Sequence, residues 1–291
     1  MKYDCYLIGP VSIDYDEAFD GIVKKFIGGA LIYSSYAELA GGRRLGAVTK
    51  MAQEDQYVLD PFYIKDMTRL PSKATTSIHN TYHTPDRERR TAVVHGQIDT
   101  FRVEDIPDVE SEIYQMAGLI YGDYDNALFP FLAARGKVAC DMQGFLRRAE
   151  DGALVFRDWE DKKEYLPYIT YLKTDAAEAE IMTGCTDRKE AAKMLFDWGA
   201  KEIMITHNTE VLVYDGEAFH TCPLRARNLS GRTGRGDSTF GSYITERIEK
   251  SIPDALLYAS ALVGLKMETF GPFKGSRKDV EEYIRELYAE Y

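Results

Sequence analysis

Cysteine is scarce and scattered in this chain of 291 residues, and no C-x-x-C pair occurs. The four cysteines are Cys5, Cys140, Cys185 and Cys222. This pattern argues against a disulfide scaffold or a zinc ribbon, and it favours small buried thiols in a reducing cytosol. His79 and His83 lie four residues apart on a β-prone stretch. Since no cysteine or third histidine lies nearby, we expect polar strand positions there and no metal site.

A basic surface and a long apolar run are also absent. The chain has 47 acidic and 36 basic residues, a net charge of −11, which argues against a nucleic-acid partner. No apolar run approaches the roughly 20 residues that span a bilayer. The first residues, MKYDC, do not start a secretory signal. We therefore expect a cytoplasmic protein that binds neither nucleic acid nor membrane.

Two common nucleotide motifs are missing as well. No G-x-x-x-x-G-K-[ST] phosphate loop occurs, since the glycine-rich segment 41–46 lacks the Lys-Ser/Thr end. The first strand runs into the sequence GPVS at 9–12, without a G-x-G-x-x-G fingerprint. This argues against a nicotinamide-dependent oxidoreductase.

Alternating β-rich and helical stretches indicate an α/β fold. Strands are expected at residues 3–9, 44–49, 118–121, 137–141, 169–173, 202–206 and 211–214. Helices are expected at 30–40, 187–198, 237–250, 253–268 and 277–289. The alternation predicts a mostly parallel sheet covered by helices on both faces.

One region interrupts this alternation. Residues 75–83 and 91–97 are β-prone, and the charged segment 85–90 separates them, which predicts a β-hairpin. The hairpin is either decoration or a lid that keeps water from a site of phosphoryl transfer.

The most informative segment is the glycine loop TGRGDS at 233–238, which leads into an amphipathic stretch. Two glycines around Arg235 allow successive N–H groups to face one space. A helix that begins at Asp237 would add its positive end, which favours phosphate. An acidic residue at this helix start would repel a bound phosphate, so it is better suited to face a hydroxyl that attacks one. The alternative is an ordinary helix start, because Asp, Ser and Thr all cap helices well.

The order of four features resembles the ribokinase-like, or PfkB, family of carbohydrate and nucleoside kinases. The glycine loop is similar to the family pattern D-T-x-G-A-G-D, and the sequence GGA at 28–30 is similar to G-G-x-x-x-N. The segment LKTDAAEA at 172–179 is similar to L-K-x-N-x-x-E-A, and an early strand ends near Asp14. Weaker similarities are THN at 206–208, to T-x-G, and GPF at 271–273. The resemblance extends over essentially the whole chain.

The resemblance implies a three-layer α/β/α fold with a mostly parallel central sheet and a small β-sheet lid. It implies one domain over residues 1–291, with lid segments at about 11–27 and 72–100. It also implies ATP-dependent phosphorylation of a hydroxyl on a small polyhydroxylated substrate, which is a sugar, a cyclitol such as inositol, or a nucleoside. Relatives often dimerise through the lid, so a homodimer is expected.

The resemblance also implies roles for individual residues. Asp237 would be the catalytic base, and the N–H groups of Gly234, Arg235 and Gly236 would stabilise the moving phosphoryl group. The substrate-binding residues would be Asp14, Gly28, Gly29, Tyr33 and Arg147. The ATP-binding residues would be Asp175, Thr206, Thr233, Gly234 and Gly236. Glu178, with Asp175, would hold Mg²⁺ through water.

Some positions depart from the family pattern. Gly231 and Arg232 stand where the pattern has its leading Asp and Thr. In many relatives that Asp belongs to a monovalent-cation site, so K⁺ dependence is doubtful. Arg235 replaces the Ala between the glycines, and it either pairs with phosphate or extends into solvent. Tyr33 replaces the Asn of G-G-x-x-x-N, which implies an altered substrate pocket.

Alternatives remain at several of these residues. Asp14 is also interpretable as a turn residue in the acidic stretch 14–20, and Arg147 as an exposed helical arginine. Asp175 and Glu178 are also interpretable as a solvated first helical turn. The departures at the glycine loop also leave open a non-catalytic sugar- or nucleoside-binding protein on the same fold.

Overall fold

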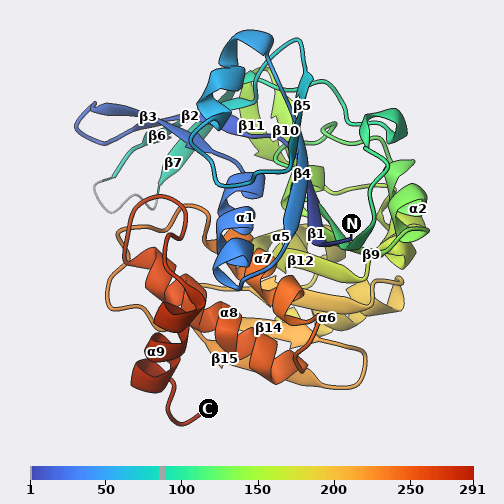
Figure 1. The fold of residues 1–291 in the computed structure, drawn as a ribbon, viewed down its shortest axis with the longest axis vertical. Coiled ribbons are helices and arrows are strands. Elements are labelled where there is room, and N and C mark those ends of the chain that lie inside the picture. Colours follow the sequence, from blue (N-terminus) through green and yellow to red (C-terminus); the bar gives the residue numbers. More distant parts are fainter. Residues whose placement is uncertain (1, 85–88) are drawn as a thin grey trace.

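A nine-stranded sheet lies at the centre of the computed structural model, which describes residues 2–84 and 89–291 (Figure 1). In spatial order its strands are β15 (Phe219–Pro223), β14 (Glu210–Tyr214), β13 (Glu202–Thr206), β12 (Tyr171–Asp175), β9 (Lys137–Asp141), β8 (Ser111–Met116), β1 (Tyr3–Ile8), β4 (Leu45–Met51) and β5 (Met67–Pro71). Neighbours are parallel except at β13–β14 and β14–β15. The carboxyl ends of β9, β12 and β13 therefore share one edge.

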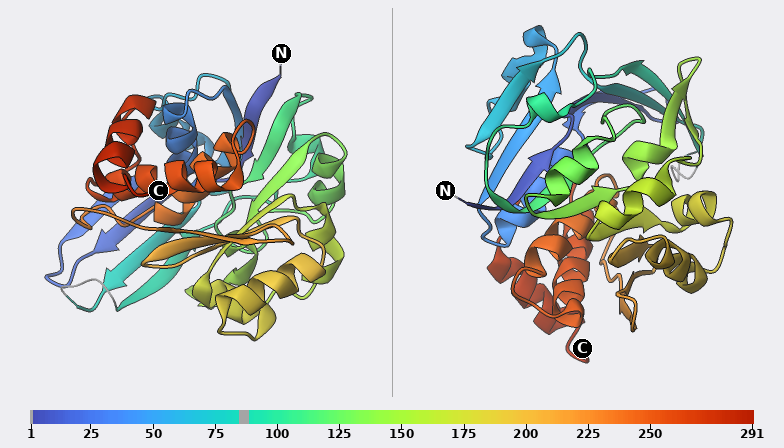
Figure 2. Two further views of the ribbon diagram at one scale, coloured as in Figure 1. Left: turned by 90° about the horizontal axis from the view of Figure 1, so that it is seen from below. Right: turned by 90° about the vertical axis from the view of Figure 1, so that its right-hand side faces the viewer.

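Helices cover both faces of this sheet (Figure 2). On one face lie α1 (Ala30–Ala40), α7 (Arg235–Glu246), α8 (Ile252–Met267) and α9 (Arg277–Leu287). On the other lie α2 (Leu128–Ala133), α3 (Gln143–Leu146), α5 (Ala176–Thr183) and α6 (Arg188–Asp197). The remaining short helix is α4 (Lys162–Tyr165), and 3₁₀ turns occur at Gln53–Leu59, Val103–Asp105 and Leu166–Tyr168.

The alternation along β1 explains the two layers. Cys5 and Leu7 pack in the core beneath α1 and α8, whereas Tyr6 and Ile8 pack in the opposite core. Successive side chains of a strand point to opposite faces, so a strand buried on both sides is apolar throughout. The predicted three-layer α/β/α fold is confirmed.

A second, smaller sheet has six strands. In spatial order they are β10 (Arg147–Glu150), β11 (Ala153–Phe156), β7 (Arg90–Gly96), β6 (Ser77–Tyr82), β2 (Ser12–Glu17) and β3 (Val23–Gly28). The expected hairpin corresponds to β6 and β7, and residues 85–88 of its charged turn lie outside the described residues. The sequence analysis did not assign β10 and β11.

Two expected elements are shifted. The strand expected at 118–121 lies earlier, at β8, because Ile113 and Met116 pair with Cys5 and Ile8 of β1 in the buried sheet. α7 begins two residues before Asp237, because Gly234 adopts a φ of 74° and caps the helix. In the described parts of the chain, no helix is long and apolar enough to cross a membrane.

Candidate active site

A cavity of about 620 Å³ lies between the small sheet and the carboxyl ends of the central strands. This is the edge at which open α/β sheets bind their ligands. Its strand-end side includes Lys173 and Asp175 of β12 and Thr206 of β13. The glycine loop and the start of α7 also line the cavity.

The small-sheet side of the cavity is polar. Asp14 and Phe26 are cross-strand partners on β2 and β3, and Asp16 and Asn80 are partners on β2 and β6. Paired residues share one face of a sheet, and these four line the cavity together with Arg90. One face of the small sheet therefore presents two carboxylates, an amide and a guanidinium to any ligand.

The first turn of α7 leaves donors at the centre of the site. The Arg235 N–H donates to the Arg232 carbonyl at 3.2 Å. Among the described residues, the N–H groups of Gly236 and Asp237 have no acceptor. They lie at the positive end of a twelve-residue helix, which is the arrangement that binds phosphate oxygens.

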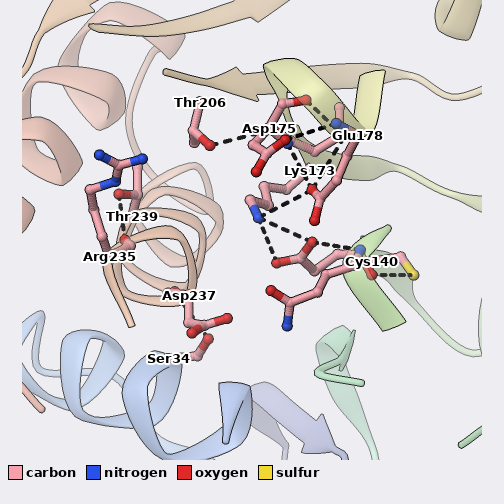
Figure 3. Close-up of polar contacts among 12 residues, drawn as sticks. Ser34, Cys140, Lys173, Asp175, Glu178, Thr206, Arg235, Asp237 and Thr239 are labelled. Carbon is pink, nitrogen blue, oxygen red and sulfur yellow. Dashed lines mark hydrogen bonds and ion pairs between the residues drawn. The ribbon is translucent and has the colours of Figure 1, made fainter. Parts of the chain in front are cut away.

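Asp237 lies on the third residue of α7 and lines the cavity (Figure 3). Its backbone carbonyl accepts a hydrogen bond of 3.0 Å from Ser34 Oγ on α1. Within residues 2–84 and 89–291, its carboxylate has no hydrogen-bond or ion-pair partner. Burial raises the pKa of this carboxyl, while the charges of Lys173 and Arg147 oppose the rise. The carboxyl is thus half-buried at the cavity wall, unpaired, and within the influence of several cations.

Lys173 contacts two carboxylates beneath the glycine loop. Its Nζ lies 2.9 and 3.2 Å from the two carboxyl oxygens of Asp141 and 3.9 Å from Glu178 Oε2. A Cβ on Gly236 would lie only 3.1 Å from this nitrogen. The nearby carboxylates raise the pKa of Lys173, so it remains charged despite its burial.

Glu178 and Asp175 form the N-terminal cap of α5. Glu178 Oε2 accepts from the Asp175 N–H at 2.9 Å, and Asp175 Oδ1 accepts from the Glu178 N–H at 2.8 Å. Asp175 lines the cavity, so its carboxylate fits a Mg²⁺ ion that keeps most of its waters. Glu178 is buried and does not line the cavity, so it does not fit as a direct ligand. The alternative of a solvated helical turn is wrong for Glu178.

Asp14 lies in the middle of β2, so its interpretation as a turn residue is wrong. Its Oδ2 accepts from Ser12 Oγ at 2.7 Å and its Oδ1 from the Ile78 N–H at 3.0 Å. Gly28 does not line the cavity, but a Cβ there would lie 2.8 Å from Asp14 Oδ2. Gly29 lines the cavity with a φ of 102°, which only glycine adopts readily.

Arg147 begins β10 and lines the cavity, so its interpretation as an exposed helical residue is also wrong. Its guanidinium carbon lies 5.6 Å from the ring centroid of Phe156. In the described parts of the chain the guanidinium has no hydrogen-bond or ion-pair partner, and its Nε is shielded from solvent. Burial lowers the pKa of Arg147, while the charges of Glu178, Asp141 and Asp237 oppose that change.

The remaining expected residues also reach the cavity. Tyr33, Thr206, Thr233 and Arg235 all line it. Arg235 is not directed freely into solvent, since its Nη1 donates to Asn208 Oδ1 at 3.0 Å. Burial and the neighbouring Arg232 charge both lower the pKa of Arg235. Two guanidiniums are therefore close together on the strand-end side.

Several lining residues were missed by the sequence analysis. They are Asp16, Asn80, Arg90, Gln143 and Lys173. A usable signal existed for Asp16, because it stands two residues after Asp14 and so shares its strand face. Lys173 lies inside the recognised segment at 172–179. The sequence does not show that its ammonium pairs with Asp141, so its place in the site could not be predicted.

The fold and this site define a ribokinase-like kinase that transfers a phosphoryl group to an alcohol. Residues 64–277 match the model of the pfkB family carbohydrate kinases, and the chain belongs to that family.

Solved structures and a named relative agree with this assignment. A pyrophosphate-dependent kinase of the ribokinase family, solved with sulfate, is 32% identical, with a TM-score of 0.87 over 95% of this chain and 99% of that one. A structure of this type complexed with a pyrophosphate analog and myo-inositol has a TM-score of 0.86 at 32% identity, over 95% of this chain and 99% of that one. A cytidine kinase of Thermococcus kodakarensis is 28% identical, over 83% of this chain and 87% of its own. A ribokinase of Arabidopsis thaliana, solved with ribose and ATP, shares the fold at 13% identity, with a TM-score of 0.77 over 98% of this chain and 99% of that one.

Proposed function

We propose that this kinase phosphorylates a hydroxyl of a small polyhydroxylated molecule, with Asp237 as the catalytic base. The observation that carries the proposal is the unpaired Asp237 carboxylate beside the free N–H groups of Gly236 and Asp237, in one cavity with Asp14 and Asp175. An anion-binding helix end next to a proton acceptor suits a phosphate and an alcohol that meet there.

The reaction follows from this arrangement. The acceptor oxygen attacks the terminal phosphorus of the donor, the bond from that phosphorus to the bridging oxygen breaks, and the acceptor proton passes to Asp237. Since the phosphoryl group is loosely bonded in the transition state, a weak base that orients the hydroxyl suffices. The amides of Gly236 and Asp237 and the unpaired guanidinium of Arg147 would stabilise the charge on its oxygens.

The acceptor would lie against the small sheet. Asp14 and Asp16 offer oxygens to hydroxyl hydrogens, and Asn80 offers both a donor and an acceptor. Such a wall suits a compact polyol, and the relatives named for myo-inositol and for cytidine make cyclitols and nucleosides the first candidates.

The donor would lie against the strand-end side, with its terminal phosphate at the start of α7. The resemblance implies ATP with Mg²⁺, and Asp175 would hold the ion through water. When bound, Mg²⁺ neutralises donor phosphate charge. Thr206 and Thr233 would contact the remaining phosphates.

Inorganic pyrophosphate is a second candidate donor. Arg232 and Arg235 stand where the family pattern has uncharged Thr and Ala, and both line the cavity. Two added guanidiniums suit a donor that consists of phosphate alone. The relatives at 32% identity are pyrophosphate-dependent, which supports this choice.

A matrix of donors and acceptors tests both proposals. Purified protein is incubated with ATP or pyrophosphate and with inositols, sugars or nucleosides, and acceptor phosphate esters are measured by mass spectrometry. Asp237→Asn should retain donor binding by calorimetry and lose about 10²- to 10⁴-fold in kcat. Normal turnover by this variant would refute the base assignment. Tight polyol binding without any ester would favour the non-catalytic alternative.

A further inference from the structure

Lys266 is a fully buried cation at the last turn of α8. Its Nζ donates to the Gly231 carbonyl at 2.6 Å and also to the Thr233 carbonyl. The same nitrogen lies 5.1 Å from the ring centroid of Tyr33. All its polar contacts thus go to the backbone of the segment that leads into the glycine loop.

These contacts fix the direction of a loop amide. In a planar trans peptide the C=O and the following N–H point in opposite directions. The Thr233 carbonyl belongs to the same peptide unit as the Gly234 N–H. An ammonium that holds this carbonyl therefore turns the Gly234 N–H away from α8.

The segment is clamped on its other sides as well. The Gly231 N–H donates to the Met267 carbonyl at 2.7 Å, and a Cβ on Gly231 would lie 1.7 Å from the Thr269 carbonyl. A Cβ on Gly234 would lie 2.1 Å from the Tyr33 ring. The departures Gly231 and Tyr33 thus belong to one packed unit with Lys266.

Converging backbone carbonyls are the usual ligands of a bound cation, and here an ammonium already takes two of them. We propose that Lys266 is the resident cation of this loop, so that phosphoryl transfer requires no monovalent metal ion. The K⁺ expected in many relatives does not fit here, because Gly231 supplies no carboxylate and its carbonyl is occupied by Lys266 Nζ. The inference rests on the proposed function, since it assigns Lys266 as a positioning residue for that phosphate site.

The charge state of Lys266 agrees with this role. Burial lowers its pKa to about 8, and the Asp237 carboxylate opposes that change. Near neutral pH the side chain is therefore mostly charged. No carboxylate forms an ion pair with it among the described residues, so its charge is directed at the loop and at Asp237.

The first test uses the unmodified protein. Pyrophosphate affinity by calorimetry and turnover are measured in potassium, sodium and tetramethylammonium salts of equal ionic strength. Affinity and turnover should each agree within about twofold across the three salts, because the Lys266 ammonium occupies the cation position whichever salt is present. Stimulation by potassium of about tenfold or more would overturn the proposal.

The second test removes the ammonium. Lys266→Ala should lower kcat and pyrophosphate affinity by about 100-fold, and methylammonium or potassium should restore part of both. Lys274→Met, a change at an exposed lysine near the same end, is the control and should behave as wild type. A loss that no small cation restores would indicate a packing role and overturn the proposal, and so would an unchanged variant.

The two proposals can fail separately. If wild type phosphorylates none of the acceptors, the proposed function falls, while the pyrophosphate affinities in the three salts still decide the role of Lys266. If Lys266→Ala does not fold, shown by circular dichroism, the salt series on wild type still decides it. If wild type is active but requires potassium, only the Lys266 proposal falls.

Discussion

The carboxyl group of Asp14 is buried, yet it must be ionised to accept hydrogen bonds through both oxygens. Both its oxygens accept hydrogen bonds, yet burial raises its pKa to about 6. Each carboxylate oxygen has a second lone pair, so the ionised group still accepts from a ligand hydroxyl. Because the pKa lies near 6, modest acidification protonates the group and removes part of that capacity.

Acceptor binding should therefore weaken in acid. Below about pH 6 the protonated Asp14 loses an acceptor site, so the KM for the acceptor should rise as pH falls through this pKa. Asp14→Asn should raise KM about tenfold near neutrality, the value of one hydrogen bond to a charged group. Its KM should also be independent of pH between 5 and 8, roughly the interval over which Asp14 titrates in wild type. An acid rise of KM that persists in this variant would contradict the assignment.

The sequence predicted much of the site at the level of single residues. Motif order identified Asp237, Asp175, Thr206 and Asp14, and all four line one cavity. Glu178 is buried behind Asp175, and its Oε2 belongs to the cap of α5, which a motif does not show; its role in holding Mg²⁺ through water stays a prediction. The sequence gives no indication of Lys266, whose ligands are backbone carbonyls 33 and 35 residues away.

The position of Asp237 depends on how closely α7 approaches α1. A Cβ on Gly241 would lie 2.7 Å from Glu38 Oε1 and 3.0 Å from Ser34 Cα. Burial raises the pKa of Glu38 to about 8, so this carboxyl is neutral at the interface near pH 7. Ser34 also donates to the Asp237 carbonyl, so the helix contact and the site share a residue.

Gly241→Ala should therefore destabilise the protein, against the usual trend. At an open helix position this change stabilises by about 1 kcal/mol, because glycine is the poorer helix former. Here the added methyl group must displace Ser34 of α1, and overpacking costs about 1–3 kcal/mol. Thermal unfolding should show a lower Tm, and kcat should fall as α7 shifts. Adding Glu38→Ala should recover only part of the Tm, because the Ser34 backbone remains. A variant with an unchanged or higher Tm would show that the two helices are not in close contact.

Helices and strands with strong local sequence signals were predicted, and those without such signals were missed. The helix at 187–198 was recovered as α6, because Asp187 caps it with hydrogen bonds to Lys189 and Glu190. The strands 137–141 and 202–206 were recovered exactly. β10 and β11 were missed, because they are four residues each and join the small sheet only through the pairing of β11 with β7, which is far away in the sequence.

At the scale of the whole molecule, the small sheet has two different faces. One face lines the cavity through Asp14, Asn80 and Arg90. On the other face Tyr15 stacks on His79 at 5.9 Å, and Val93, the cross-strand partner of His79, is 42% exposed. Val23, at the end of β3, is half exposed. We propose that a second copy of the chain packs on this outer face, as the resemblance to lid-dimerising kinases implies.

A dimer through this face makes a specific prediction. The unmodified protein should have twice the monomer mass by light scattering, because a β-sheet face that carries exposed valines and a stacked aromatic pair gains stability when it is covered. Val93→Glu would place a carboxylate at the centre of that contact, and burial of an unpaired charge should raise the dimer Kd by at least about tenfold, or about 1.4 kcal/mol. Tyr168→Glu is the control, since Tyr168 is exposed to a similar extent, at 39%, but lies outside the small sheet. The acceptor KM should rise in the Val93 variant, because the same strands carry Asn80 and Arg90 on their opposite face. A wild-type protein that is monomeric at every concentration, or a Val93→Glu variant that dimerises as tightly as Tyr168→Glu, would exclude this interface.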